Sequence, residues 1–304
     1  MYRIGVDLGG TNIAAGLVDE NNKLVYKNSI KTGKGKDTIL QNVCDAVLSI
    51  IKETNTDVKQ ISYVGIGVPA TCDYEEGIIK YATNLGFENV NIREIVTKAT
   101  GLPVYIENDG NAAALGEAVA GAGFNHKSTL MITLGTGIGV GVVLNDKLVK
   151  GDVEAGHHII NIGGPVCGCG NHGCFEAFCS ATALIRDAKE LATKHNNTSI
   201  LKFAKDIDSI EAKNVFEAAD SGDELFLGLI DEYICHLAIG INNLVNTYPV
   251  EAVILGGGVG QRKELLDPIH AQLKKIALGG AVKPVYNATL GNDAGILGAA
   301  FIND

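Results

Sequence analysis

One histidine and three cysteines lie close together in the sequence: His157, Cys167, Cys169 and Cys174. Three thiolates and one imidazole suit a tetrahedral zinc ion, and the glycines between them let a short backbone fold around it. His158 and His172 are alternative histidine ligands that we rank below His157. Because four protein ligands close the coordination shell, the pattern favours a structural zinc over a catalytic zinc or buried free thiols.

Three glycine-rich segments follow predicted strands. The candidate phosphate-binding residues in them are Asp7, Gly9, Gly10, Thr11, Asn12, Gly135, Thr136, Gly137, Gly256, Gly257 and Gly258. Backbone N–H groups at glycine turns can bind phosphate oxygens, and Thr11 and Asn12 add side-chain donors. Any one segment could be an ordinary turn, but three together favour a nucleotide site. Asp7 could hold Mg²⁺, directly or through water.

Two common nucleotide loops do not fit this sequence. It has no Gly-Lys-Ser/Thr segment, which argues against a P-loop. It also has no strand–Gly-x-Gly-x-x-Gly–helix unit, which argues against a dinucleotide site.

The tripeptide Glu107-Asn108-Asp109 lies between a predicted strand, 103–107, and a predicted helix, 111–120. An aspartate at such a junction often only caps the helix. Alternatively, Asp109 is a general base that accepts a proton from a substrate hydroxyl during phosphoryl transfer. Asn108 offers both a donor and an acceptor, as sugar hydroxyls require.

The elements that position these residues repeat along the chain. Two sets of three strands with the same plan are predicted: 2–7, 13–18 and 23–28, then 130–134, 140–144 and 147–150. This internal repeat predicts two similar lobes. The main predicted helices are 38–54, 92–100, 111–120, 224–245, 264–278 and 294–302. Strands that alternate with helices indicate an α/β fold with mixed sheets.

The overall composition narrows the class of protein. A chain of 304 residues with 46% apolar residues is globular and suits two domains or lobes. A net charge of −10 without a basic stripe argues against a nucleic-acid partner. Seven cysteines, an odd number, indicate reduced thiols and a metal site. With no leader and no apolar stretch of spanning length, we expect a cytoplasmic protein without membrane association.

Taken together, these residues resemble the ROK family (bacterial repressors, open reading frames and sugar kinases) over essentially the whole chain. Residues 7–16 are similar to its first phosphate motif, 134–139 to its second, and 107–109 to its catalytic triplet. Glu154-Ala155-Gly156-His157 matches its Glu-x-Gly-His element, and residues 167–176 match its Cys-x-Cys-Gly-x-x-Gly-Cys-x-Glu signature. Gly256-Gly257-Gly258-Val259 is similar to its adenosine-side turn.

The resemblance implies a two-lobed, actin-like (ribonuclease H-like) ATPase fold that closes over ATP and a sugar. The N-terminal lobe would comprise 1–117 and about 294–304, and the C-terminal lobe 118–293 with the zinc loop at 154–176. Asp109 would be the base. The residues that would bind the sugar are Asn84, Asn108, Asp109, Glu154, His157 and Glu176. His157 would serve both zinc and sugar through its two ring nitrogens.

The function implied is ATP- and Mg²⁺-dependent phosphorylation of a hexose at its 6-hydroxyl, with glucose preferred, by a homodimer or dimer of dimers. Two segments depart from the common family pattern, 68–71 and 82–87, and both lie where the sugar would be contacted. N-acetylmannosamine, N-acetylglucosamine, fructose and allose therefore stay open as substrates, and polyphosphate as donor. A sugar-responsive transcriptional regulator ranks lower, because such members carry a helix-turn-helix before the first phosphate motif, whereas this chain reaches Asp7 at once.

Overall fold

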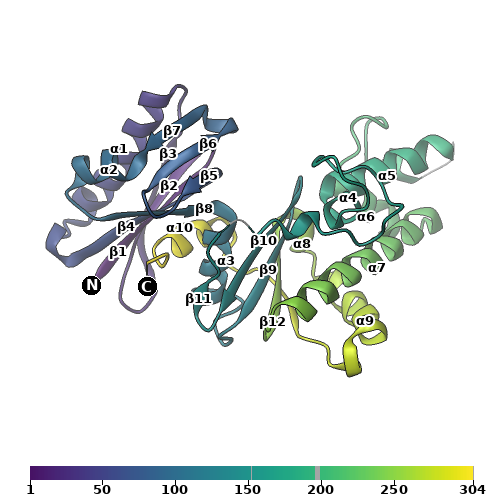
Figure 1. Cartoon of the computed structure of the whole chain (residues 1–304). Helices are drawn as coiled ribbons and strands as arrows, with labels where there is room; N and C mark the ends of the chain where they lie inside the picture. The colour runs from purple at the N-terminus through teal and green to yellow at the C-terminus, as the bar shows by residue number, and fades with distance from the viewer. Residues whose placement is uncertain (152, 196–198, 304) are drawn as a thin grey trace. The chain divides into compact units, whose positions relative to one another are not determined.

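The computed structural model describes residues 1–151, 153–195 and 199–303, and every predicted site residue lies within these ranges. The chain forms two compact units (Figure 1). Unit 1 comprises Met1–Thr129, Gly141–Asp152 and Thr289–Asp304, and unit 2 comprises Leu130–Val140 and Val153–Ala288. Their bounds differ from those of the expected lobes, which stay a prediction.

Unit 1 is built on a five-stranded mixed sheet of order β3-β2-β1-β4-β8. Its strands are β1 (Tyr2–Leu8), β2 (Asn12–Val18), β3 (Leu24–Lys31), β4 (Ile61–Val68) and β8 (Val104–Asn108). The first three are antiparallel neighbours, whereas β4 and β8 run parallel to β1. The carboxyl ends of β1, β4 and β8 therefore meet at one edge of the sheet, where ligands bind in open α/β sheets.

Helices cover both faces of this sheet. One layer consists of α1 (Lys36–Thr54) and α2 (Ile92–Thr100), and the other of α3 (Asp109–Ala120) and α10 (Ala294–Ala299). Along β1 the buried side chains of Ile4, Val6 and Leu8 join the core cluster that includes Val43 and Val47 of α1. The alternate residues, including Asp7, face α10, because successive side chains of a strand point to opposite faces.

A small antiparallel sheet in unit 1 was not predicted. Its strands are β5 (Thr71–Asp73), β6 (Ile78–Ala82) and β7 (Phe87–Asn91). Ile79, Phe87 and Val90 are buried in the same core cluster. The Arg93 guanidinium fixes the β5–β6 turn, since it donates to the carbonyl oxygen of Tyr74 at 2.9 Å. This sheet carries the short 3-10 helix Thr83–Leu85 on its β6–β7 connection.

A second five-stranded sheet has the order β11-β10-β9-β12-β13, which repeats the plan of the first. Its strands are β9 (Thr129–Leu134), β10 (Ile138–Leu144), β11 (Lys147–Leu148), β12 (Ala252–Gly256) and β13 (Val285–Asn287). The helices of unit 2 are α4 (Phe175–Cys179), α5 (Ala181–Lys194), α6 (Ala212–Asp220), α7 (Glu224–Thr247), α8 (Gly257–Gly260) and α9 (Leu266–Ile276). The predicted α/β fold with mixed sheets and an internal repeat is confirmed.

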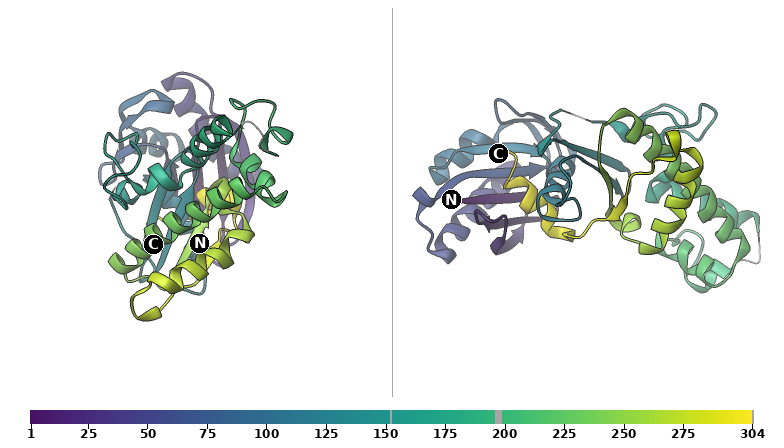
Figure 2. Two further views of the ribbon diagram at one scale, coloured as in Figure 1. Left: turned by 90° about the vertical axis from the view of Figure 1, so that its right-hand side faces the viewer. Right: turned by 90° about the horizontal axis from the view of Figure 1, so that it is seen from below.

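Helices α7 and α9 pack side by side in unit 2, as the green and yellow-green helices of Figure 2 show. The buried residues of α7 are Phe226, Tyr233, Ile234, Leu237, Ala238, Gly240, Ile241 and Leu244. The predicted helix 264–278 is a 3-10 turn followed by α9 and ends at Ile276. The predicted helix 294–302 ends earlier, at Ala299.

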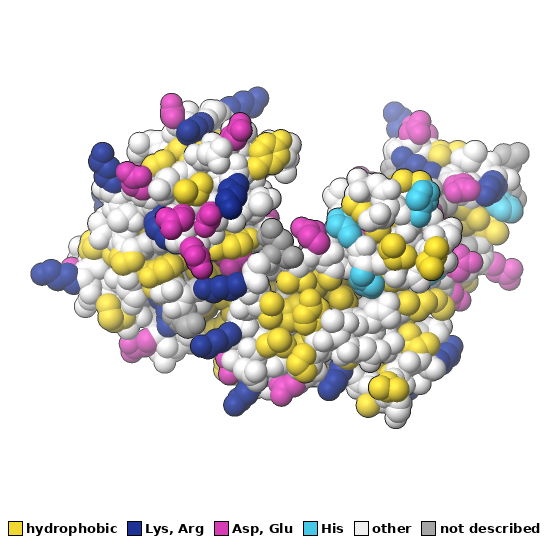
Figure 3. Space-filling view, viewed as in Figure 1, with side chains coloured by type: hydrophobic (Ala, Val, Ile, Leu, Met, Phe, Trp, Pro, Cys, Tyr) yellow, Lys and Arg dark blue, Asp and Glu magenta, His cyan; other side chains and the backbone are white. Residues whose placement is uncertain are grey.

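The distribution of charged side chains on the surface agrees with the absence of a basic stripe in the sequence. On the face shown in Figure 3, basic and acidic side chains are interspersed. Over the ranges that the structure describes, no helix combines the length and the apolar character needed to cross a membrane.

Candidate functional site

Three acidic residues of unit 1, Asp7, Glu107 and Asp109, lie at or just after the carboxyl ends of its parallel strands. Asp7 of β1 pairs with Gly67 of β4, and Gly67 pairs in turn with Glu107 of β8. Asp109, two residues after Glu107, begins α3. Asp7 and Asp109 are close enough for the charge of one to affect the other.

The junction of β8 and α3 holds Asp109 in place. The side-chain oxygen of Asn108 accepts the N–H groups of Gly110 at 2.9 Å and Asn111 at 3.2 Å, so Asn108 is the N-cap. The buried Glu107 carboxylate accepts the Asn108 N–H at 2.9 Å and the Asn111 side-chain amide at 3.0 Å. Asn108, rather than Asp109, is therefore the main cap of α3.

The electrostatics of this edge favour a proton or a cation. Burial raises the pKa of Asp109. Burial and, after it, the charge of Asp109 raise the pKa of Asp7 from 3.8 to about 6. Two partly desolvated carboxylates that repel each other are suited to accept a proton or to share a divalent cation with a bound anion.

The first glycine turn lines a cavity next to Asp7. The turn is closed by a hydrogen bond from the Gly9 N–H to the Asn12 carbonyl at 3.0 Å, and the Thr32 hydroxyl donates to the Gly9 carbonyl at 2.6 Å. The cavity has a volume of about 640 Å³, and its lining includes Asp7, Gly9, Gly10, Thr11, Asn12, Lys27 and Asp293. This volume is in the range of ligand pockets.

The second and third glycine segments meet in unit 2. Gly135, Thr136 and Gly258 line one cavity of about 340 Å³ together with Phe216 and Arg262, which were not predicted. The third segment was predicted to be a turn. In the structure it begins a helix instead, because α8 starts at Gly257 directly after β12. Gly257 has φ 77°, and a Cβ there would lie 2.4 Å from the Leu134 carbonyl oxygen, so this close approach requires glycine.

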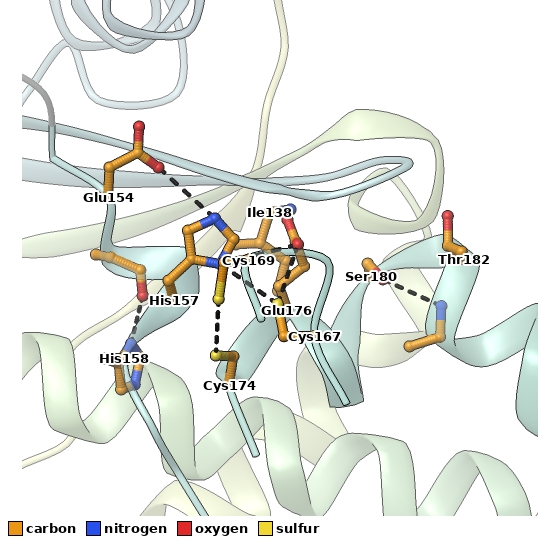
Figure 4. A network of polar contacts seen from close by, with 12 residues as sticks. Ile138, Glu154, His157, His158, Cys167, Cys169, Cys174, Glu176, Ser180 and Thr182 are labelled. Atoms are coloured by element: carbon orange, nitrogen blue, oxygen red, sulfur yellow. Dashed lines mark hydrogen bonds and ion pairs between the residues drawn. The ribbon is translucent and has the colours of Figure 1, made fainter. Parts of the chain in front are cut away.

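The four predicted metal ligands come together in unit 2. The ligand atoms of His157, Cys167, Cys169 and Cys174 all lie within 4.8 Å of one another. The Cys169 and Cys174 sulfurs are 3.7 Å apart, and the Cys167 sulfur lies 3.5 Å from Nδ1 of His157 (Figure 4). Tetrahedral zinc with bonds of about 2.3 Å to sulfur and about 2.0 Å to nitrogen would place two sulfurs about 3.8 Å apart and a sulfur and a nitrogen about 3.5 Å apart. These two contacts fit a zinc ion.

The alternative histidines do not complete this cluster. The ring of His158 faces the Ala155 carbonyl and packs on Phe175, with the ring centres 5.2 Å apart. His172 is not among the residues that converge on the cluster. His157 is therefore the histidine that the geometry places with the three cysteines.

Glu176 joins the cysteine loop to the second glycine turn. One carboxylate oxygen accepts the Ile138 N–H at 2.9 Å, at the start of β10. The other lies 3.6 Å from the Cys167 sulfur and 3.9 Å from Nδ1 of His157. A Cβ on Gly137 would lie 2.3 Å from the Glu176 carboxylate, so glycine at this position leaves room for it. One side chain thus links a predicted phosphate turn to the metal loop.

The predicted sugar ligands divide between the two units. Glu154, His157 and Glu176 lie together in unit 2, with Nε2 of His157 3.8 Å from the Glu154 carboxylate (Figure 4). Asn108 and Asp109 lie together in unit 1, where Asn84 is exposed on the 3-10 helix Thr83–Leu85. The roles of all these residues stay predictions.

Comparison with known proteins finds one family for nearly the whole chain. The family model described as ROK family matches residues 3–304. A glucokinase of Thermotoga maritima is 37% identical over 98% of this chain and 96% of that protein. A xylose repressor of Caldicellulosiruptor bescii is 33% identical over 83% of this chain and 65% of that protein.

Two solved structures extend this likeness to the fold. The ROK hexokinase from Thermus thermophilus has a TM-score of 0.86 and 33% identity, and the match covers 99% of this chain and 97% of that one. A ROK family glucokinase from Streptomyces griseus, in complex with glucose and AMPPNP, has a TM-score of 0.76 and 35% identity, with 99% and 98% covered.

Proposed function

This chain belongs to the ROK family, and we propose that it is an ATP-dependent sugar kinase that phosphorylates the 6-hydroxyl of a hexose, with glucose as the preferred acceptor. The observation that carries the proposal is that Asp7 and Asp109 lie near each other at one sheet edge, beside a glycine turn that lines a cavity. The relatives named glucokinase and the neighbour bound to glucose and AMPPNP support the choice of sugar and donor.

In the proposed reaction, Asp109 accepts the proton of the sugar 6-hydroxyl as its oxygen attacks the terminal phosphorus of ATP. The bond from that phosphorus to the bridging oxygen breaks, and ADP leaves. Because burial raises the pKa of Asp109, its carboxylate is a stronger base than an exposed aspartate. The hydrogen bonds around Asn108 orient this base, and positioning of the reactants dominates phosphoryl transfer.

The phosphates would be bound by the glycine turns. The backbone N–H groups of 9–12 in unit 1 and of 135–137 in unit 2 would donate to phosphate oxygens. The carboxylate of Asp7 is a hard oxygen donor, and the like charge of Asp109 destabilises its negative charge. A bound Mg²⁺ would relieve this repulsion, directly or through water. When bound, Mg²⁺ supplies neutralisation of phosphate charge.

The sugar would be bound by hydrogen bonds from Asn84, Asn108, Glu154, His157 and Glu176. His157 would hold zinc through Nδ1, which faces the Cys167 sulfur, and its Nε2–H would then be directed to the sugar. A shell of three thiolates and one imidazole is complete, so the zinc would stabilise the loop and would not activate water.

A panel assay tests this proposal. ADP release is measured with ATP and Mg²⁺ against glucose, fructose, allose, N-acetylglucosamine and N-acetylmannosamine. We expect the largest kcat/KM with glucose and a product phosphorylated at O6. Activity on acetylated sugars alone would refute the choice of glucose but keep the kinase proposal. The same assay with polyphosphate in place of ATP tests the phosphate donor.

The xylose repressor among the relatives favours a second candidate, a sugar-responsive regulator. Sequence-specific DNA binding that responds to sugar at physiological salt, without ADP release on any sugar, would support it over the kinase. A homodimer stays a prediction that light scattering of the purified protein tests.

A further inference from the structure

Lys27, on the edge strand β3, lines the same cavity as Asp7 and the first glycine turn. In the β2–β3 pairing Lys27 lies opposite Gly16, and Ser29 lies opposite Ala14. Paired residues of antiparallel strands share a face of the sheet. At Gly16 this face is covered by α10, because a Cβ there would lie 2.8 Å from the side chain of Ile296. Lys27 therefore lies on the α10 side of the sheet, where its ammonium group reaches Asp293.

An ion pair holds Lys27 at this cavity. Its Nζ lies 2.7 and 2.9 Å from the two carboxylate oxygens of Asp293, which directly precedes α10. The Lys27 side chain is 56% exposed and that of Asp293 32% exposed, so water competes with the pair. A solvated ion pair contributes little to stability, and Lys27 can exchange its partner at small cost.

The charged side chains around the cavity suit an anionic ligand that is bound together with a cation. The side chains lining it in the described structure include two carboxylates, Asp7 and Asp293, and one cation, Lys27. Terminal phosphates of a nucleoside triphosphate carry several negative charges, which Mg²⁺ neutralises only in part. An ammonium group on a flexible stem can move from a carboxylate to a phosphate oxygen that arrives beside it.

We propose that Lys27 binds a phosphate oxygen of the nucleoside triphosphate, and that Asp293 holds its ammonium group ready when no nucleotide is present. This inference rests on the proposed kinase function and adds a residue that its motifs do not contain. Lys27 contributes to donor binding and to neutralisation of the transferred phosphate. Asp293 acts only through Lys27 and is a positioning residue.

The test compares Lys27→Met, Lys27→Arg and Asp293→Asn by steady-state kinetics with varied ATP and saturating sugar and Mg²⁺. We expect Lys27→Met to lower kcat/KM for ATP by roughly ten- to a hundredfold, the effect of losing a charge-assisted hydrogen bond. The KM for sugar should stay unchanged. Lys27→Arg should restore much of the activity, and Asp293→Asn should stay within about threefold of wild type, as for an exposed pair.

Lys31→Met is the matched control, because Lys31 is exposed on the same face of β3 but does not line the cavity. It should behave as wild type. Equal losses in Lys27→Met and Asp293→Asn would mean that the ion pair is only structural and would overturn the proposal, as would an unchanged Lys27→Met.

A second measurement separates this inference from the proposed function. Mg²⁺ with a non-hydrolysable ATP analogue should raise the unfolding temperature of the wild type more than that of Lys27→Met. If the wild type phosphorylates no sugar but shows this difference, the proposed function fails and the phosphate contact stands. If both proteins respond equally, the contact is refuted.

Discussion

Replacing Asp7 by asparagine should stabilise the ligand-free protein while it abolishes activity. Asp7 is half-buried, and its pKa is raised from 3.8 to about 6 by burial and by the charge of Asp109. A carboxyl group with a higher pKa in the folded than in the unfolded state binds its proton more tightly when folded. The stabilisation by this proton is complete below about pH 4 and is lost as the pH rises through about 6.

The size of the effect follows from the shift. Each pKa unit corresponds to about 1.4 kcal/mol, so the charged Asp7 costs the folded state up to about 3 kcal/mol at pH 7.5. Asparagine has nearly the same shape and no charge, and it removes this cost. For one cooperative transition of a chain of this length, about 3 kcal/mol raises the unfolding temperature by roughly 5 °C.

The assay is thermal unfolding of wild type and Asp7→Asn between pH 4 and pH 8, with EDTA and without nucleotide or sugar. The difference between the two unfolding temperatures should be largest above pH 7 and should vanish near pH 4. Glu88→Gln removes one exposed carboxylate from the same unit and serves as the control. An Asp7→Asn protein that is no more stable than wild type at pH 7.5 would refute the reasoning.

Three further predictions concern the other site residues. Asp109→Asn should bind sugar nearly normally but lose about two to four orders of magnitude in kcat, and near-normal turnover would exclude Asp109 as the base. Cys169→Ser should lower the zinc content from about one ion per chain and weaken both sugar binding and stability, whereas Cys235→Ser should not; full activity in a zinc-free protein would contradict this account. Gly137→Ala should force the Glu176 carboxylate away from the Ile138 N–H and cost about 1.5–3 kcal/mol of stability in denaturant unfolding. Gly139→Ala is its control, since a Cβ there makes only an ordinary 3.9 Å contact, and equal stability of the two variants would refute the clash.

The sequence predicted the repeated strand plan because strand-length apolar runs and glycine turns recur in the same order. It also predicted which four side chains converge in one cluster that could hold a metal ion, since ligand type and spacing are visible in a sequence. The three-stranded sheet β5–β7 was missed because strands of three to five residues show too little alternation to be recognised. Its pairing is decided by burial of Ile79 and Phe87 in a core formed by distant segments.

Other features depend on contacts between residues that are far apart in the sequence. The turn predicted at Gly257 is the start of a helix, and its glycine is required by the close approach of the Leu134 carbonyl, which is distant in the sequence. Phe216 and Arg262 line a cavity, yet in the sequence they look like ordinary helix and loop residues. The ion pair of Lys27 joins two residues that are 266 positions apart in the sequence, so no local pattern indicates it.

If the proposed donor and zinc sites are correct, the contact of Glu176 with the Ile138 N–H would couple the two binding events. The same carboxylate lies 3.6 Å from the Cys167 sulfur, so a rearrangement of the cysteine loop moves a group that supports the glycine turn. By linkage, the factor by which zinc changes the affinity for nucleotide equals the factor by which nucleotide changes the affinity for zinc. Competition with a chelator, with and without nucleotide, would therefore measure the coupling between the metal loop and the glycine turn.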